Sequence, residues 1–210
     1  MALLFYAVFM GFLYTVPKLP VLNESVRNLH FHVPMWFAMY MMLFVSMIFA
    51  IRYLAKPSEQ HDAISAQASE TGLWFGVFGI ITGMLWARFT WGDWWSGDPK
   101  QNCAAIALLI YAAYSVLRNS IEDEQQRAKI SAVYNIFAFA TLFPLLYILP
   151  RMSDTSLHPG SRNQLGVDPD SNLRLVFWPA AIGWTLLAWW ITSIGIRIRV
   201  LHMKRRGIIS

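Results

Sequence analysis

The sequence predicts an all-α membrane protein, a six-transmembrane-helix bundle in which residues 1–210 form one polytopic domain. Hydrophobic residues make up 56% of the chain and charged residues only 14%, whereas an ordinary soluble domain carries about 25% charged residues. The apolar residues gather in long runs separated by polar loops, and no repeat or linker divides the chain. Both observations favour a single helical bundle in a lipid bilayer.

Six apolar segments define the predicted helices. A hydrocarbon core of ~30 Å requires roughly 20 residues at ~1.5 Å each. Residues 2–16 fall short, but no basic residue precedes them and no small-residue cleavage pattern follows, so we interpret them as a membrane helix rather than a signal peptide. Pro144 should bend the fifth helix. The other five segments reach or approach the crossing length: 33–54, 72–89, 99–117, 130–149 and 175–196.

Basic residues indicate the direction of crossing. The C-terminal tail is rich in arginine and lysine, which is typical of a cytoplasmic segment. Six crossings then place both termini in the cytoplasm, and we expect a multi-pass protein of the bacterial cytoplasmic (inner) membrane. The loops 17–32, 88–100 and 150–174 would face the periplasm. The basic residues of the expected cytoplasmic segments are Arg52, Lys56, Arg118, Arg127, Lys129, Arg197, Arg199, Lys204, Arg205 and Arg206.

The sequence argues against several classes of function. The chain has one cysteine, Cys103, so it can form neither an internal disulfide nor a CxxCH heme-attachment motif. No GxxxxGK[ST] sequence is present, so ATP hydrolysis by this chain is not expected. The net charge of +5 lies largely in the basic tail, and we expect membrane lipid, and no nucleic acid, as a partner.

The second outer loop combines tryptophans with charged residues. Flat indoles stack on a planar macrocycle, and cations can pair with its propionates, so a porphyrin would suit the loop. An aromatic belt at the headgroup level is the alternative and explains any one of these tryptophans. The predicted binding residues of the loop are Trp91, Gly92, Trp94, Trp95, Asp98 and Lys100.

Two of these residues also have structural interpretations. Asp98 directly precedes Pro99 at the start of an apolar run, which predicts a helix N-cap followed by proline at the first helical position. Such a cap would hold the tryptophan loop in a fixed orientation, so both roles are compatible. Lys100 is either a propionate partner or an interfacial lysine whose amine reaches toward water.

Three of the five histidines share the outer side with the tryptophans. His61 and His202 belong to an inner loop and the basic tail, where a solvated role is expected. His30 and His32 directly precede the second helix, and His158 lies in the third outer loop. Because neutral imidazole is a standard ligand of heme iron, histidines on two different loops make a plausible axial pair.

The motifs also resemble a known family. Residues 91–98, Trp-Gly-Asp-Trp-Trp-Ser-Gly-Asp, resemble the WWD signature of heme-handling membrane proteins, roughly W-G-x-W-W-x-W-D, although Gly97 replaces the third tryptophan. Residues 31–34, Phe-His-Val-Pro, and residues 157–161, Leu-His-Pro-Gly-Ser, are similar to the two histidine segments of the CcmC type within that cytochrome c maturation family. The resemblance covers almost the whole chain.

The resemblance implies a specific role. His32 and His158 would be the axial ligands of a heme b iron, the tryptophan loop would lie against the porphyrin, and Lys100 would approach the heme edge. The chain would bind heme at the periplasmic face and deliver it to a CcmE-like heme chaperone. A CcmD-like small subunit and a CcmA/CcmB ABC-type complex would assist. The chain would then be a heme transporter rather than a conventional enzyme, and no catalytic residue is predicted.

Three alternatives remain open. A membrane cytochrome b of electron transfer would place its ligating histidines inside the apolar helices, and no predicted apolar segment contains a histidine. A cytochrome c synthase shares the tryptophan loop but tends to be larger, with more helices and more histidines. A purely structural membrane subunit would bind no heme.

Overall fold

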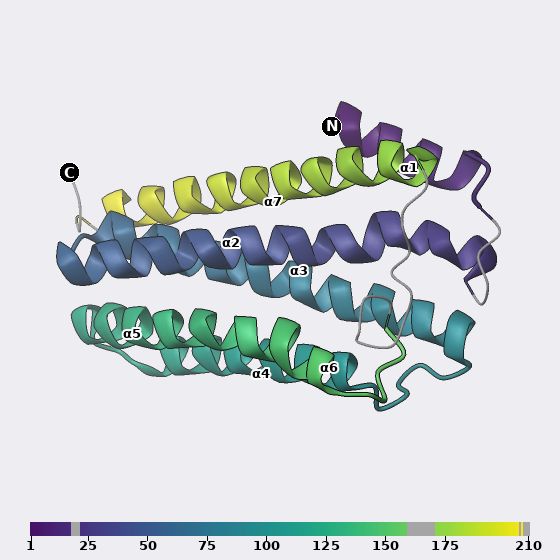
Figure 1. The fold of residues 1–210 in the computed structure, drawn as a ribbon. Helices are drawn as coiled ribbons and strands as arrows, with labels where there is room; N and C mark the ends of the chain where they lie inside the picture. The colour runs from purple at the N-terminus through teal and green to yellow at the C-terminus, as the bar shows by residue number, and fades with distance from the viewer. Residues whose placement is uncertain (18–21, 159–170, 206, 208–210) are drawn as a thin grey trace.

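A computed structural model describes residues 1–17, 22–158, 171–205 and 207, and all the regular structure within these ranges is helical (Figure 1). The all-α prediction is therefore confirmed for the described residues. The elements are α1 (Ala2–Leu13), the 3₁₀ turn η1 (Asn23–Asn28), α2 (Leu29–Ala55), α3 (Glu59–Trp91), α4 (Pro99–Ser120), α5 (Glu124–Phe143), the π-helical turn η2 (Pro144–Ile148), α6 (Leu149–Met152) and α7 (Ser171–Arg205).

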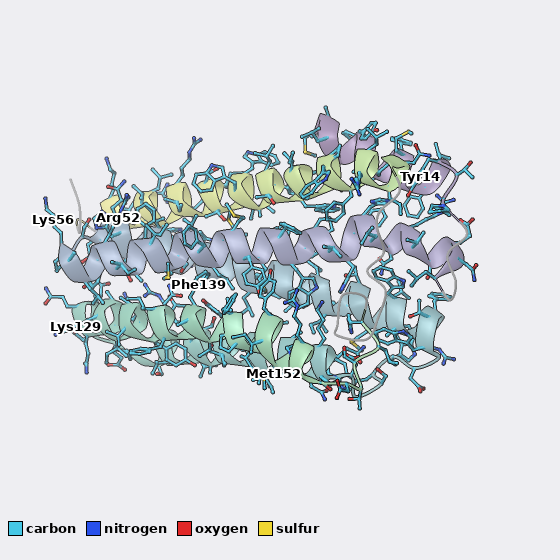
Figure 2. All side chains as sticks on the ribbon, viewed as in Figure 1. Tyr14, Arg52, Lys56, Lys129, Phe139 and Met152 are labelled. Carbon is cyan, nitrogen blue, oxygen red and sulfur yellow. The ribbon has the colours of Figure 1, made fainter. Side chains whose placement is uncertain are left out.

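The long helices run side by side in alternating directions (Figure 1). Helix α2 is central and packs against α3, α5 and α7, while α4 packs against α3 and α5. One end of the bundle carries the loop 92–98, the start of α2 and the residues that follow α6; we call it the tryptophan-loop end. Arg52, Lys56 and Lys129 lie at the other end, which we call the basic end (Figure 2).

Five helical segments are long and apolar enough to cross a membrane: Asn23–Ala55, Glu59–Trp91, Pro99–Ser120, Glu124–Met152 and Asn172–Arg205. The multi-pass character of the chain is thus supported. Helix α1 has only 12 residues, about 18 Å at ~1.5 Å per residue, and it ends at Leu13 rather than at residue 16. Its first residues pack against Gly183 within α7. A sixth membrane crossing, by α1, stays a prediction.

Most helices extend beyond the apolar segments that predicted them. Helix α3 begins at Glu59 rather than at residue 72, and α7 continues to Arg205 rather than to residue 196. The predicted bounds followed the apolar runs, whose length corresponds to the thickness of the hydrocarbon core. Backbone hydrogen bonds within a helix need no apolar side chain, so the helices continue into polar sequence. Pro144 begins the π-helical turn that connects α5 to α6.

Small residues allow α2 and α3 to pack closely. Gly72, Gly76, Gly79 and Gly83 recur every three or four residues and line one face of α3. A Cβ atom at any of them would come within 3.0 Å of a neighbouring side chain, including Leu43, Met39, Trp36 and His32 of α2. Close helix approach through small residues is a common packing mode in membranes.

Charged pairs tie the helices together toward the basic end. The guanidinium of Arg118 donates to both carboxylate oxygens of Asp62, and both side chains are only 13% exposed. On α7, Arg199 donates to Gln67 at 2.7 Å and to Glu70 at 2.6 Å. These contacts fix α3 against α4 and α7. The candidate site lies at the opposite end of the bundle.

Candidate functional site

His30 and His32 lie within the first turns of α2, which begins at Leu29. The expectation that both precede the helix was therefore wrong, because the helix extends four residues beyond its apolar segment. Neither lies near the middle of α2, since both are within four residues of the helix start. The case against a membrane cytochrome b thus depends on this position at the helix end, not on the absence of histidine from the helix.

The two histidines face different neighbours. His30 is fully buried, and its Nε2 lies 3.0 Å from the hydroxyl of Tyr14 at the end of α1. His32 faces α3, where its Nδ1 lies 3.0 Å from the carbonyl oxygen of Gly79 and 3.3 Å from the Thr82 hydroxyl. His30 is therefore part of the contact between α1 and α2, whereas His32 is available to the site.

The environment of His32 fixes its tautomer. Because a carbonyl oxygen can only accept, the Nδ1 of His32 must carry the proton that it donates to Gly79. The lone pair is then on Nε2, which makes no hydrogen bond with any described residue. A metal-binding histidine commonly donates its other N–H to a carbonyl or carboxylate in this way. The geometry fits an imidazole that presents Nε2 to iron.

Close packing fixes the plane of the same imidazole. A Cβ atom at Gly83 would lie 2.7 Å from Cε1 of His32, so only glycine leaves the ring its space. The rings of Trp36 and Trp86 meet the imidazole edge to face, with centroids 6.2 and 5.8 Å away. The indole N–H of Trp86 donates to the Ser25 hydroxyl at 3.1 Å.

Asp98 joins the start of α4 to the segment that contains His158. As predicted, its carboxylate caps α4 by accepting the backbone N–H of Lys100 at 2.8 Å, with Pro99 at the first helical position. It also accepts from Nδ1 of His158 at 2.9 Å and from the backbone N–H of Leu157 at 2.6 Å. The cap thus positions a histidine 60 residues away.

The charge of Asp98 is stabilised by these donors. Burial raises the pKa of the carboxyl group, but the hydrogen bonds from His158, Leu157 and Lys100 and the nearby imidazole outweigh it and lower the pKa to about 2. The ionised carboxylate can only accept hydrogen bonds, so it selects the His158 tautomer that carries its proton on Nδ1. In the neutral form of this imidazole, the lone pair is then on Nε2, as in His32.

The tryptophan loop packs differently at each of its indoles. Trp91 meets the His158 ring edge to face, with centroids 4.9 Å apart. Trp94 and Trp95 are 52% and 40% exposed, and the Trp95 indole N–H donates to Asn102 at 3.0 Å. Of the three, Trp91 alone touches a predicted iron ligand. The other two are substantially exposed at the tryptophan-loop end.

Two glycines shape the loop. Gly92 ends α3 with a φ of 90°, and Gly97 has a φ of 72°. Both lie in the left-handed region, which costs an L-residue about 1–2 kcal/mol. No atom lies within 4 Å of a Cβ built on either glycine. Conformation, and not space, therefore requires glycine at these turns, including the position where the resembled signature has a tryptophan.

The predicted ligands converge on one region between α2, α3 and the start of α4. His32 contacts the ring of Trp86, and His158 contacts the ring of Trp91 at the end of the same helix α3. The two imidazoles come from two different elements, one from α2 and one from the segment held by Asp98. Within the described ranges, no group of three or more His, Cys, Asp or Glu side chains could hold a metal ion by itself. A pair of imidazoles suits an iron whose other four ligands are porphyrin nitrogens.

The outer basic residues have distinct partners. Arg27 donates to Glu24 and to the backbone carbonyls of Gly11 and Tyr14, so it fastens η1 to α1. Arg88 donates to the carbonyl of Gly92. Arg162 and the last three residues of the 157–161 segment lie outside the described residues.

Sequence reasoning missed the residues that hold the site in place. Gly79, Thr82, Gly83 and Trp86 of α3 contact His32, and Ser156 donates to Asp98 at 3.3 Å. The recurrence of glycine every three or four residues in α3 was a signal that could have identified the closely packed helix face. No comparable pattern marks Ser156.

Comparison with known proteins bears on this site. A family model described as "Cytochrome C assembly protein" matches residues 1–158, which include every predicted site residue. The chain belongs to this cytochrome C assembly protein family. Its members' part in cytochrome c assembly supports the predicted involvement with heme and the membrane location.

Curated relatives match shorter segments of the chain. A cytochrome c biogenesis protein CcsA of Prochlorococcus marinus is 41% identical over 80 residues, which is 38% of this chain and 25% of the relative. CcsA of a Synechococcus species is 37% identical over 86 residues, 41% of this chain and 28% of the relative. The matches span about a quarter of these relatives' length. They carry the name CcsA and not CcmC, so the family is shown but not the CcmC type.

Proposed function

We propose that this cytochrome C assembly protein binds heme b between His32 and His158 at the tryptophan-loop end and presents it to an acceptor during cytochrome c maturation. One observation carries the proposal: each imidazole is held through its Nδ1, by Gly79 or by Asp98, so that Nε2 bears the lone pair. Two imidazoles prepared in this way are suited to the two axial positions of heme iron.

Each predicted residue has a definite part in this proposal. Trp91 supports the His158 ring, while Trp94 and Trp95 offer exposed faces on which a porphyrin can stack. Gly92 and Asp98 hold the loop in position, and Lys100 supplies a positive charge beside the Asp98 cap. Heme is the cargo and brings the iron and the reactive porphyrin edge. The chain itself binds and orients, so we propose a heme-handling protein and not a conventional enzyme.

We further propose that the tryptophan-loop end faces the periplasm and the basic end faces the cytoplasm of a bacterial cell. The positive residues of the basic end support this orientation. The C-terminus then lies in the cytoplasm. A crossing by α1, which would place the N-terminus there too, is part of the proposal.

The acceptor that we propose is a CcmE-like heme chaperone, with a CcmD-like small subunit and a CcmA/CcmB ABC-type complex as further partners. The arrangement of the histidine segments and the tryptophan loop supports this choice through the resemblance to the CcmC type. A second candidate function is cytochrome c synthesis, in which an apocytochrome accepts heme directly. The relatives' name, cytochrome c biogenesis protein CcsA, favours this alternative.

The test begins with an absorption spectrum of the detergent-purified protein, oxidised and reduced, together with a pyridine hemochrome assay. We expect a b-type signal with two imidazole ligands. The His32→Ala, His158→Ala double variant should lose that signal. A matched His61→Ala, His202→Ala variant should keep it, because both histidines lie away from the site. A double variant that keeps a normal bis-imidazole spectrum would refute the ligand assignment.

The acceptor is tested by expressing the chain with one candidate at a time. Heme covalently attached to a CcmE-like chaperone would support delivery to a chaperone. A mature c-type cytochrome formed with this chain as the single maturation protein would favour synthesis. A wild-type protein that stays colourless after heme is supplied would refute both functions.

A further inference from the structure

We propose that Arg151 of α6 pairs with Lys100 of α4 to bind the two heme propionates, and so determines which edge of the heme remains accessible to the acceptor. This inference rests on the proposed function. The resemblance associates Lys100 alone with the heme edge, whereas the second cation and the resulting heme orientation come from the fold.

The two cations belong to neighbouring segments at the tryptophan-loop end. Lys100 lies in the first turn of α4, and α6 (Leu149–Met152) packs against α4. Asp98, which caps α4 beside Lys100, also accepts from His158 at 2.9 Å. The two cations thus lie on segments that pack together, and the first turn of α4 adjoins a predicted iron ligand.

No carboxylate of the described residues forms an ion pair with either cation, Lys100 or Arg151, although Arg27, Arg118, Arg127 and Arg199 are paired in this way. Asp98 is the carboxylate that acts on Lys100, but its oxygens already accept from His158, Leu157 and the Lys100 backbone. Bringing two like charges together is unfavourable unless an anion joins them. A ligand with two carboxylates supplies that anion.

The guanidinium of Arg151 is held in a position that suits such a ligand. One of its guanidinium N–H groups donates to the carbonyl of Tyr147 at 3.1 Å, and the guanidinium lies over the Tyr147 ring, 5.4 Å from its centroid. Arginine has five N–H donors, so others remain for a carboxylate. Tyr147 belongs to the π-helical turn η2, a feature that often occurs at functional sites. The turn determines where the guanidinium lies.

The pair would orient the heme. Both propionates leave the porphyrin from one edge, and the vinyl groups lie on the other side of the ring. With the propionates at Lys100 and Arg151, the vinyl side points away from the α4 and α6 side of the site. The cations would therefore select which edge an acceptor meets, while the imidazoles hold the iron.

The experiment compares hemin with hemin dimethyl ester, whose propionates carry no charge. Purified wild-type protein in detergent should bind hemin at least tenfold more tightly than the ester, because charge-assisted hydrogen bonds are lost with the ester. Arg151→Gln should weaken hemin binding about tenfold and leave the affinity for the ester unchanged. Arg151→Lys, which retains the charge, should recover most of the preference. Both variants should keep the bis-imidazole spectrum.

Controls separate the possible failures. Lys129→Gln makes the same change of charge at the basic end and should bind both porphyrins as the wild type does. The Lys100→Gln, Arg151→Gln variant should bind hemin and the ester equally. If Arg151→Gln keeps the full preference for hemin, the propionate assignment is wrong while the proposed function stands. A wild type that binds neither porphyrin would overturn both.

Discussion

Asp98→Asn removes the charge from the carboxylate that joins α4 to His158 while keeping its size. One oxygen of Asp98 accepts from Lys100 and His158, and the other accepts from Leu157 at 2.6 Å. An asparagine has a single acceptor oxygen. If this oxygen continues to accept from Lys100 and His158, the amide NH₂ faces the N–H donor of Leu157. These two donors repel each other, so the variant should retain α4 but shift Leu157 and, with it, the adjacent His158.

The size of the effect follows from the carboxyl pKa. A pKa of about 2, compared with a usual value of 3.8, corresponds to about 2 kcal/mol of preference for the charged form at neutral pH. Because the pKa is lowered in the folded state, this stabilisation is complete above about pH 4 and is lost as the pH falls toward 2. Loss of an outer partner of a metal-binding histidine typically lowers metal affinity by about 10–100-fold.

The assay measures heme affinity and the midpoint of thermal unfolding in the same preparation. We expect Asp98→Asn to weaken heme binding about 10–100-fold and to lower stability by about 2 kcal/mol at neutral pH. Asp93→Asn changes the same group in the same loop, where the side chain is exposed, and should match the wild type. An Asp98→Asn protein with wild-type heme affinity would show that the carboxylate does not position His158.

Three further results are expected. Gly83→Ala should weaken heme binding about tenfold or more, because its Cβ would lie 2.7 Å from Cε1 of His32 and rotate the imidazole; an unchanged titration would contradict this. Asp62→Ala should cost about 3–5 kcal/mol in chemical unfolding because Arg118 stays buried, whereas Glu124→Gln, in an exposed pair, should cost less than about 1 kcal/mol. Heme at about 100 times its Kd should stabilise the wild type by about 2.7 kcal/mol, measured by thermal unfolding, and should not stabilise the variant without both imidazoles.

Hydropathy predicted the fold class because a bilayer requires long apolar helices. It could not predict where the helices end. Residues 59–71 of α3 are largely polar and small, yet they continue the helix and pack Ser65 and Gln67 against α2 and α7. The length of α1 was also misjudged, because Tyr14 takes an extended conformation that its apolar neighbours do not reveal.

The candidate site was predicted in its residue types but not in its connections. The Asp-Pro pair predicted the cap at Asp98 from local sequence alone, and the structure confirms it. Its bond to His158 joins residues 60 positions apart, and no local pattern encodes such a contact. Likewise, Gly79 and Gly83 support His32 only because α3 returns antiparallel to α2 and brings its glycine face to that turn.

The different roles of His30 and His32 follow from the geometry of the helix that contains both. Successive residues of an α-helix are turned by about 100°, so residues two apart lie about 200° apart and face opposite sides. One of the two must face α1 if the other faces α3, which agrees with the contacts to Tyr14 and to Gly79. Had both residues stayed in a loop, as the hydropathy suggested, either could have turned toward the site. Extending α2 to Leu29 removes that freedom, so a single histidine of the pair is left to meet His158.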